Sequence, residues 1–208
     1  MKKLFTFIIL TIGFTVSAQI ATSGTTNSGT NASAIGYQTS ATNTVSTAMG
    51  RETLASGVTS TAMGYQTSAT NTASTAIGNN STASGITSTA IGNNSTASGE
   101  TSIAMGFETE ATHSASLAMG YQTSSTEGAS SAMGFKTTAS GFGSTSIGYE
   151  TVASGNSSTA MGWLTTANGK ASIAMGKSTI ASDFGSLVIG QYNLSGSTVT
   201  NSALLPNP

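Results

Sequence analysis

Cysteine is absent from the 208 residues, so the chain has no disulfide and no thiolate that holds a metal ion. Charged residues make up only 6% of the sequence, with six Lys and Arg against seven Asp and Glu. This weak charge, without a basic cluster, argues against a nucleic acid partner. Asp183 is the single Asp, which excludes a calcium-binding roll with one Asp per repeat. His113 is the single His, so the sequence offers no set of His and Cys ligands for a metal ion such as zinc.

Groups for catalysis are also missing. Serine is abundant, but no Ser, His and Asp set accompanies a nucleophile elbow between a strand and a helix. We therefore expect a protein that is not an enzyme and binds no cofactor.

Glycine, by contrast, recurs in strict register every 14 residues from Gly36 to Gly190, without an insertion. The residue before this glycine is always Ile or Met, and the one before that is Ala, except at Ser146 and Val188. A short period without slippage is typical of a solenoid in which each repeat forms one coil.

Each repeat has two similar halves of seven residues. Ala returns five residues after the repeat glycine, except at Ser125 and Ser195, and a second glycine often follows at position seven, as at Gly85 and Gly99. Seven residues accommodate a strand of about five residues and a tight bend, for which glycine provides the backbone freedom. The sequence thus predicts an all-β parallel roll over residues 29–193, with two short strands per coil and about twelve coils.

Side chains alternate along a strand, so Ala and the Ile/Met column must point to opposite sides. Because Ala is common to both halves, we expect Ala between the two sheets and Ile/Met on the outside of one sheet. Such an apolar column predicts self-association, and we call it the oligomer stripe. It consists of Ile35, Met49, Met63, Ile77, Ile91, Met105, Met119, Met133, Ile147, Met161, Met175 and Ile189. The alternative places Ile and Met inside the roll and Ala outside.

Two further columns are candidate binding surfaces. Directly after the repeat glycine, Phe107, Tyr121, Phe135, Tyr149 and Trp163 predict an aromatic ladder that faces a ligand or, alternatively, only stabilises the roll. Three residues after the glycine, Thr is nearly unbroken. Its ordered hydroxyls suggest an ice-binding array, whereas the alternative places them in the interior, bonded to one another or to the backbone.

The two ends differ from the repeats. Residues 1–18 have the lysines, the apolar run and the small-residue cleavage site of a signal peptide, which predicts export. Residues 19–28 form a polar lead-in, and residues 194–208 a cap remnant or a junction. No second apolar stretch follows the signal peptide, so we expect no transmembrane segment in the mature chain.

Segments such as S-T-A-I-G at 74–78, S-I-A-M-G at 102–106 and S-T-A-M-G at 158–162 resemble the repeats of YadA-like trimeric autotransporter adhesin heads. The resemblance spans about residues 28–193 and implies a left-handed roll and a homotrimer. The family's N-S-V-A-I-G form, associated with collagen binding, is not reproduced, because no coil has Val three residues before the glycine. The neck, heptad stalk and membrane barrel are not found, so we expect a fragment, a secreted chain or a chain anchored by another.

Together these features predict an exported, adhesin-like protein of the cell surface or medium. Its repetitive surface would attach to a cell, matrix protein or glycan. The alternatives are a structural spacer in a longer assembly and a protein that binds ice or a mineral surface.

Overall fold

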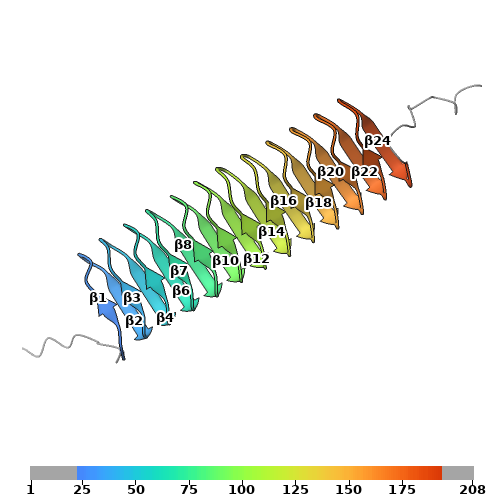
Figure 1. The fold of residues 1–208 in the computed structure, drawn as a ribbon. Coiled ribbons are helices and arrows are strands. Elements are labelled where there is room, and N and C mark those ends of the chain that lie inside the picture. The colour runs from blue at the N-terminus through green and yellow to red at the C-terminus, as the bar shows by residue number, and fades with distance from the viewer. Residues whose placement is uncertain (1–22, 194–208) are drawn as a thin grey trace, which may run out of the picture.

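Each 14-residue repeat forms one flattened coil, and the coils stack into an elongated roll (Figure 1). The computed structural model describes residues 23–193. Two parallel sheets of twelve strands lie on opposite sides of the roll, and the chain alternates between them. The predicted β-roll with two strands per coil is therefore confirmed.

The two strands of a coil are unequal, which corrects the expectation of about five residues in each. One sheet has strands of five residues, and the other has strands of two. The long strands are β2 (Ser33–Tyr37), β4 (Thr47–Arg51), β6 (Thr61–Tyr65), β8 (Thr75–Asn79), β10 (Thr89–Asn93), β12 (Ile103–Phe107), β14 (Leu117–Tyr121), β16 (Ser131–Phe135), β18 (Thr145–Tyr149), β20 (Thr159–Trp163), β22 (Ile173–Lys177) and β24 (Leu187–Gln191). The short strands are β1 (Thr26–Asn27), β3 (Ser40–Ala41), β5 (Leu54–Ala55), β7 (Ser68–Ala69), β9 (Thr82–Ala83), β11 (Thr96–Ala97), β13 (Glu110–Ala111), β15 (Ser124–Ser125), β17 (Thr138–Ala139), β19 (Val152–Ala153), β21 (Thr166–Ala167) and β23 (Ile180–Ala181).

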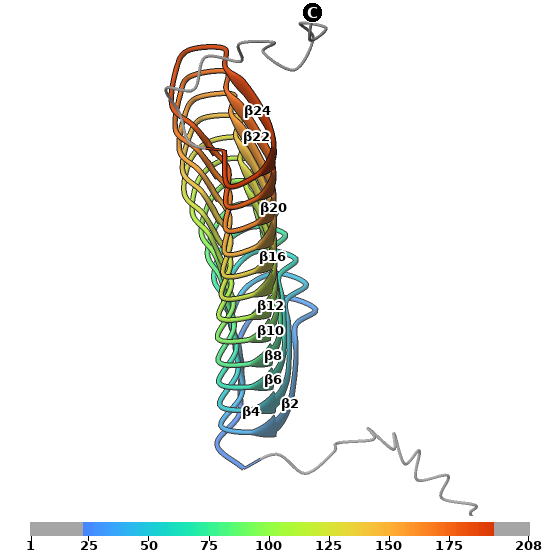
Figure 2. The same cartoon turned by 90° about the vertical axis from the view of Figure 1, so that its right-hand side faces the viewer.

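Neighbouring coils pair without a register shift, so equivalent residues of successive repeats lie directly above one another (Figure 2). Met105, for example, pairs with Met119, and Gly106 pairs with Gly120. Each sequence column thus becomes a straight row along the roll, with a step of about 4.8 Å set by the strand spacing.

The interior between the sheets is made of small side chains. Except for the partly buried Ala34 of the first coil, the alanines of both half-repeats are fully buried, as at Ala104 in β12 and Ala111 in β13. This confirms the expected direction of the Ala columns, and the alternative with Ile and Met inside is wrong. A core of Ala, Ser and Thr allows the two sheets to lie close together, because no larger side chain separates them.

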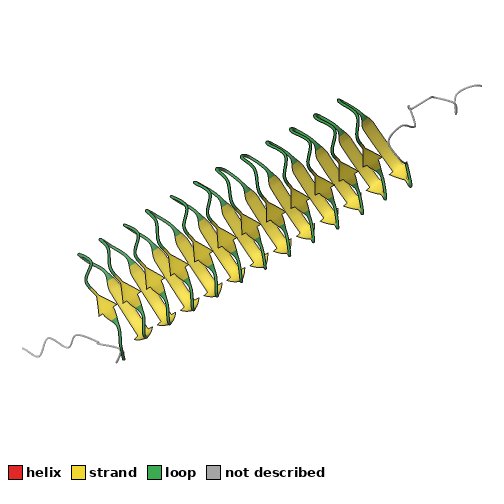
Figure 3. Cartoon of the chain, in the orientation of Figure 1, coloured by secondary structure: helices red, strands yellow, loops and turns green. Residues whose placement is uncertain are grey.

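Loops join the sheets along two edges of the roll (Figure 3). Each edge turns at a residue with a left-handed backbone, which is usually not glycine: Gln66 has φ of 52° at one edge and Ala73 has 55° at the other. Both residues donate their backbone N–H to the preceding coil, Gln66 to Arg51 O at 2.9 Å and Ala73 to Val58 O at 2.8 Å. These bonds between coils offset the cost of the left-handed conformation.

The repeat glycine is not at the bend, where the sequence placed it, but inside the long strand. Gly78 has φ of 125°, and a Cβ added to it would lie 2.0 Å from the carbonyl oxygen of Gly92 in the next coil. Glycine is required there because the backbones of successive coils approach each other too closely for a side chain. The second glycine does lie in the turn after the short strand, as at Gly85.

The threonine column three residues after the repeat glycine is buried, so it presents no ice-binding array on the surface. The alternative, which placed these threonines in the interior, is confirmed for their position, but most of the hydrogen bonds that it expected are not formed. Thr109 donates to Ser95 Oγ at 2.9 Å, but most other members have no hydrogen-bond partner for the hydroxyl. The unpartnered Oγ1 atoms belong to Thr39, Thr53, Thr67, Thr123, Thr137, Thr165 and Thr179.

Candidate functional site

The outer surface of the long-strand sheet carries both groups of candidate residues. In β12, Ile103, Met105 and Phe107 point outward, while Ala104 between them is fully buried. Alternation along the strand produces this arrangement in every coil. The oligomer stripe and the aromatic ladder are therefore neighbouring columns on one surface of the roll.

The structure places all twelve side chains of the oligomer stripe at the surface of the single chain. None is fully buried, and the exposed fraction reaches 36% at Met49 and 59% at Ile189. In four coils, Ile or Leu two residues earlier widens the stripe, with Ile103 38% and Leu187 49% exposed. A continuous apolar column along the whole roll is typical of a surface that another chain covers.

The aromatic ladder is a stack of nearly parallel rings on five successive coils. The centroids are 4.9 Å apart for Phe107 and Tyr121, and 4.8 Å for Tyr121 and Phe135. They are 4.9 Å apart for Phe135 and Tyr149, and 4.2 Å for Tyr149 and Trp163. The strand spacing imposes this step, and it suits offset stacking of aromatic rings.

Stacking decides which part of each ring is available to a ligand. The inner faces of the rings are occupied by their neighbours, so the ladder presents mainly ring edges. Tyr121 is 39% and Trp163 48% exposed, whereas Phe107, Phe135 and Tyr149 are half-buried. A sugar that stacks on a ring face therefore finds no free face in the middle of this ladder.

Between β12 and β20 the oligomer stripe and the aromatic ladder together form one wide apolar surface, which we call the apolar face. In each of these five coils an outward Met or Ile is followed, two residues later, by an aromatic ring. Outside this range the second column becomes polar at Asn79, Asn93, Lys177 and Gln191. The apolar surface is thus widest in the middle and C-terminal part of the roll.

Near the N-terminus, the same column contains a cation between two rings, a contact that was not among the features expected from the sequence. The guanidinium carbon of Arg51 lies 5.8 Å from the ring centroid of Tyr37 and 5.3 Å from that of Tyr65. These distances are in the range of cation–π contacts. The signal in the sequence was an Arg flanked, one repeat away on each side, by Tyr.

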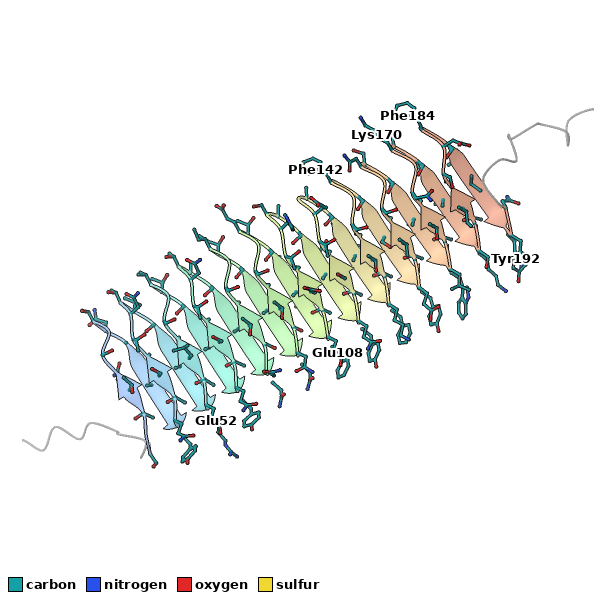
Figure 4. All side chains as sticks on the ribbon, in the orientation of Figure 1. Glu52, Glu108, Phe142, Lys170, Phe184 and Tyr192 are labelled. Carbon is teal, nitrogen blue, oxygen red and sulfur yellow. The ribbon has the colours of Figure 1, made fainter. Side chains whose placement is uncertain are left out.

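A polar column follows the ladder at the adjacent edge, near the labels of Glu52 and Glu108 in Figure 4. Gln66 Nε2 donates to Glu52 Oε2 at 2.8 Å, and Gln122 Nε2 donates to Glu108 Oε2 at 2.6 Å. These bonds join neighbouring coils at their corners. The Glu108 carboxylate remains exposed, and the half-buried Glu52 carboxylate also accepts a hydrogen bond from Arg51 Nε at 3.1 Å. Within the described residues, neither carboxylate is paired with a second acid of the kind that an acid–base pair requires.

Two tyrosines at this edge have shifted pKa values. A hydrogen bond to the Glu150 carboxylate, together with burial, raises the pKa of Tyr149 above its usual value. A hydrogen bond from the Lys177 ammonium lowers the pKa of Tyr192, whose ring centroid is 5.5 Å from that nitrogen. Both shifts have causes in neighbouring side chains of the same edge.

The opposite edge carries isolated apolar side chains instead of a continuous surface (Figure 4). Phe142 is 59% and Phe184 77% exposed, but they are separated by coils with Asn156 and Lys170 at the equivalent position. His113 lies exposed near this edge, with Nδ1 at 3.2 Å from the hydroxyl of its neighbour Thr112. This edge therefore has no apolar patch comparable with the apolar face.

Residues 23–193 contain no group of three or more His, Cys, Asp or Glu side chains arranged to hold a metal ion. Within the same residues no helix is long and apolar enough to cross a membrane. The predicted signal peptide, residues 19–22 of the lead-in and the C-terminal junction lie outside the described part of the chain.

The comparison with protein families found the model of the YadA head domain repeat, each match covering two repeats. It matches residues 28–53, 55–81, 83–109, 139–165 and 167–193. The structure continues the same coils through residues 110–138, which the family model does not match. No curated protein matches the chain. The matched segments cover more than half of the sequence and coincide with the coils of the roll, so the chain belongs to the YadA head domain family.

Proposed function

We propose that this chain is the head of an exported adhesin, which assembles as a homotrimer through the oligomer stripe and attaches to a cell, matrix protein or glycan. The observation that supports assembly is the unbroken row of outward Ile and Met side chains from Ile35 to Ile189. Membership of the YadA head family supports the adhesin role and the presence at the surface.

The stripe is large enough to contribute much of the free energy that a stable assembly requires. Covering one half-exposed Ile or Met contributes about 1 kcal/mol, so twelve of them contribute on the order of 10 kcal/mol per chain. Association costs about 4–15 kcal/mol in lost freedom of motion. The stripe alone therefore offsets much of this cost, and the apolar face adds aromatic surface.

Rotational symmetry with parallel chains suits a straight stripe, because each coil then meets the same coil of its neighbours. Equivalent residues such as Met119 lie at one height in all chains. The roll would then present its other surfaces outward, along its full length, to a binding partner.

Sedimentation of the mature chain, residues 19–208, tests the assembly. We expect the mass of a trimer for the wild type and for the double variant Met119→Ile and Met133→Ile, because Ile occupies this column in other coils. Replacing both residues with Lys places charges in the interface and is expected to give monomers. A wild-type monomer at micromolar concentration would refute the proposal.

Binding to arrays of matrix proteins and glycans tests the adhesive role. Binding that is lost in the Trp163→Ala variant, while the mass stays that of a trimer, would assign the ladder to the ligand surface. A trimer that binds nothing on the arrays would support the structural spacer instead.

A further inference from the structure

The outer surface of the short-strand sheet is a second regular surface, on the side of the roll opposite the apolar face. Its two outward columns flank the buried residue of each short strand, four and six residues after the repeat glycine. We call these two columns, from Ser40 to Ser182, the hydroxyl face. Seventeen of its twenty-two positions are Ser or Thr. Three successive coils have a hydroxyl in both columns, at Ser68, Thr70, Thr82, Ser84, Thr96 and Ser98.

Backbone hydrogen bonds between coils hold both columns in register. The backbone N–H of Ser68 donates to Ser81 O at 2.9 Å, and that of Thr70 donates to Ala83 O at 3.0 Å. The same pattern repeats in the following coils. The Cα positions therefore form a regular lattice, with steps of about 4.8 Å between coils and about 6.8 Å between columns.

The hydroxyl groups of this surface are available to an external partner. The side chains of Ser68, Thr82 and Thr96 are partly exposed, and their hydroxyls make no hydrogen bond to the described part of the chain. Thr112 is the exception on the hydroxyl face, because its hydroxyl contacts the side chain of His113. This differs from the buried serines of the core, such as Ser60, whose hydroxyl donates to Gly57 O at 2.8 Å.

The same surface has almost no charge and no aromatic ring. Glu110 is its single charged residue, and the remaining interruptions are Leu54, Val152, Asn168 and Ile180. A charged mineral or an acidic polymer finds no complementary charge here. A sugar polymer finds no ring face on which to stack.

A small soluble ligand gains little from such a surface. Each hydroxyl that bonds to a ligand gives up a bond to water, so the net gain per bond is about 1 kcal/mol or less at an exposed site. Two or three such bonds do not offset the cost of association. Many simultaneous bonds can offset this cost. To form them, a partner must be rigid and must have a repeat comparable to that of the coils.

We infer that the hydroxyl face binds the surface of ice. The water lattice of ice is uncharged and rigid, donates and accepts hydrogen bonds, and has an oxygen repeat comparable with the spacing between β-strands. The apolar interruptions Leu54, Val152 and Ile180 do not repel it, because their side chains fit between ordered waters without requiring a bond. The trimer proposed above leaves this surface free, since it uses the opposite side of the roll.

Partition of the full mature chain into slowly growing ice tests this inference. We expect the wild type to be enriched in the ice fraction relative to a non-binding protein of similar mass. The double variant Thr82→Lys and Thr96→Lys should lose this enrichment, because two lysines on adjacent coils keep the hydroxyl face away from the ice lattice. Thermal hysteresis of the solution should fall in parallel.

The matched control is the double variant Val58→Lys and Ile86→Lys, which adds the same charge at the exposed edge, where Val58 is 38% and Ile86 45% exposed. Circular dichroism and thermal unfolding verify that both variants keep the fold. Wild-type partition equal to that of the non-binding protein would overturn the inference, as would equal loss in both variants. Binding to insoluble neutral polysaccharide without partition into ice would overturn it as well. Partition into ice and sedimentation are separate measurements, so a failure of ice binding can be told apart from a failure of trimer assembly.

Discussion

The rings of Tyr149 and Trp163 are 4.2 Å apart between centroids, with their planes inclined by 16°. Tyr149 also stacks on Phe135 at 4.9 Å, whereas Trp163 ends the ladder and has one ring neighbour. Each ring contact joins two coils, so the ladder stabilises the stacking of the roll itself.

The number of ring neighbours predicts the cost of removing each ring. A stacked pair contributes about 0.5–1.5 kcal/mol beyond the burial of its area. We therefore expect Tyr149→Leu to lower the free energy of unfolding by about 2 kcal/mol and Trp163→Leu by about 1 kcal/mol. Urea unfolding of the two variants measures the difference. Tyr37→Leu, which removes a contact with Arg51 but no ring pair, serves as the control. An equal or larger loss for Trp163→Leu would contradict the ladder as the source of stability.

A second prediction concerns two glycines with different environments. An Ala at position 78 would put its Cβ 2.0 Å from the carbonyl oxygen of Gly92, at φ of 125°. Because the backbone must move to remove this clash, we expect Gly78→Ala to cost about 3–5 kcal/mol or to prevent folding of the adjoining coils.

Gly143→Ala is the matched control. Gly143 has φ of 63° and its nearest neighbour to an added Cβ is Ser157 Oγ at 3.9 Å. Ala already occupies this left-handed position in other coils, as at Ala129 with φ of 55°. We expect a change below about 1 kcal/mol in thermal unfolding. Similar losses in the two variants would show that the backbone angle, and not the contact between coils, sets the requirement.

Much of the fold was predictable from the sequence because the repeat is strict. The 14-residue period predicted the coils, and the Ala at equivalent places in both halves predicted the interior that Ala104 and Ala111 occupy. Alternation then placed Met105 outside. These conclusions depend on side-chain direction, which a strand determines residue by residue.

The corners were not predictable in the same way. Gln66, Ala73 and Glu108 have left-handed backbones, although none of these residue types favours that conformation strongly. Bonds from their backbone N–H to the preceding coil stabilise it, and these bonds exist only once the coils are stacked. The unequal strand lengths follow from the same corners, so the sequence pattern of two similar halves was misleading.

The role of the exposed columns was only partly predictable. Sequence spacing identified the rings from Phe107 to Trp163 as a ladder, but not that stacking leaves mainly their edges free. For the Thr39 column it left a surface array and an interior position both open; the column is buried, and the exposed hydroxyls lie one and three residues further along the chain. A shift of one residue along a strand moves a side chain to the other side of the sheet.

The buried threonine column gives a third prediction. Thr123 Oγ1 is buried without a hydrogen-bond partner, whereas Thr151 Oγ1 lies 2.7 Å from Ser146 Oγ. Replacing Thr123 with Val removes an unpaired polar atom at nearly constant volume, so we expect unchanged or higher stability, by up to about 1 kcal/mol. Thr151→Val leaves the buried Ser146 hydroxyl without this partner and is expected to cost about 1–2 kcal/mol. Urea unfolding that ranks the two variants in the opposite order would contradict this account of the interior.

The two shifted tyrosines give a pH-dependent prediction. The hydrogen bond to Glu150 raises the pKa of Tyr149, so this residue contributes stability that is fully present below the ordinary tyrosine value of 10.0 and is lost as the pH rises through the folded value. The pKa of Tyr192 is lowered by Lys177, so its contribution is present above 10.0 and is lost as the pH falls through the folded value. Phenolate absorbance should therefore show an early step that Tyr192→Phe removes and a late step that Tyr149→Phe removes. Glu150→Gln should move the late step toward the ordinary value without affecting the early one. If Glu150→Gln left the late step in place, the carboxylate would not be its cause.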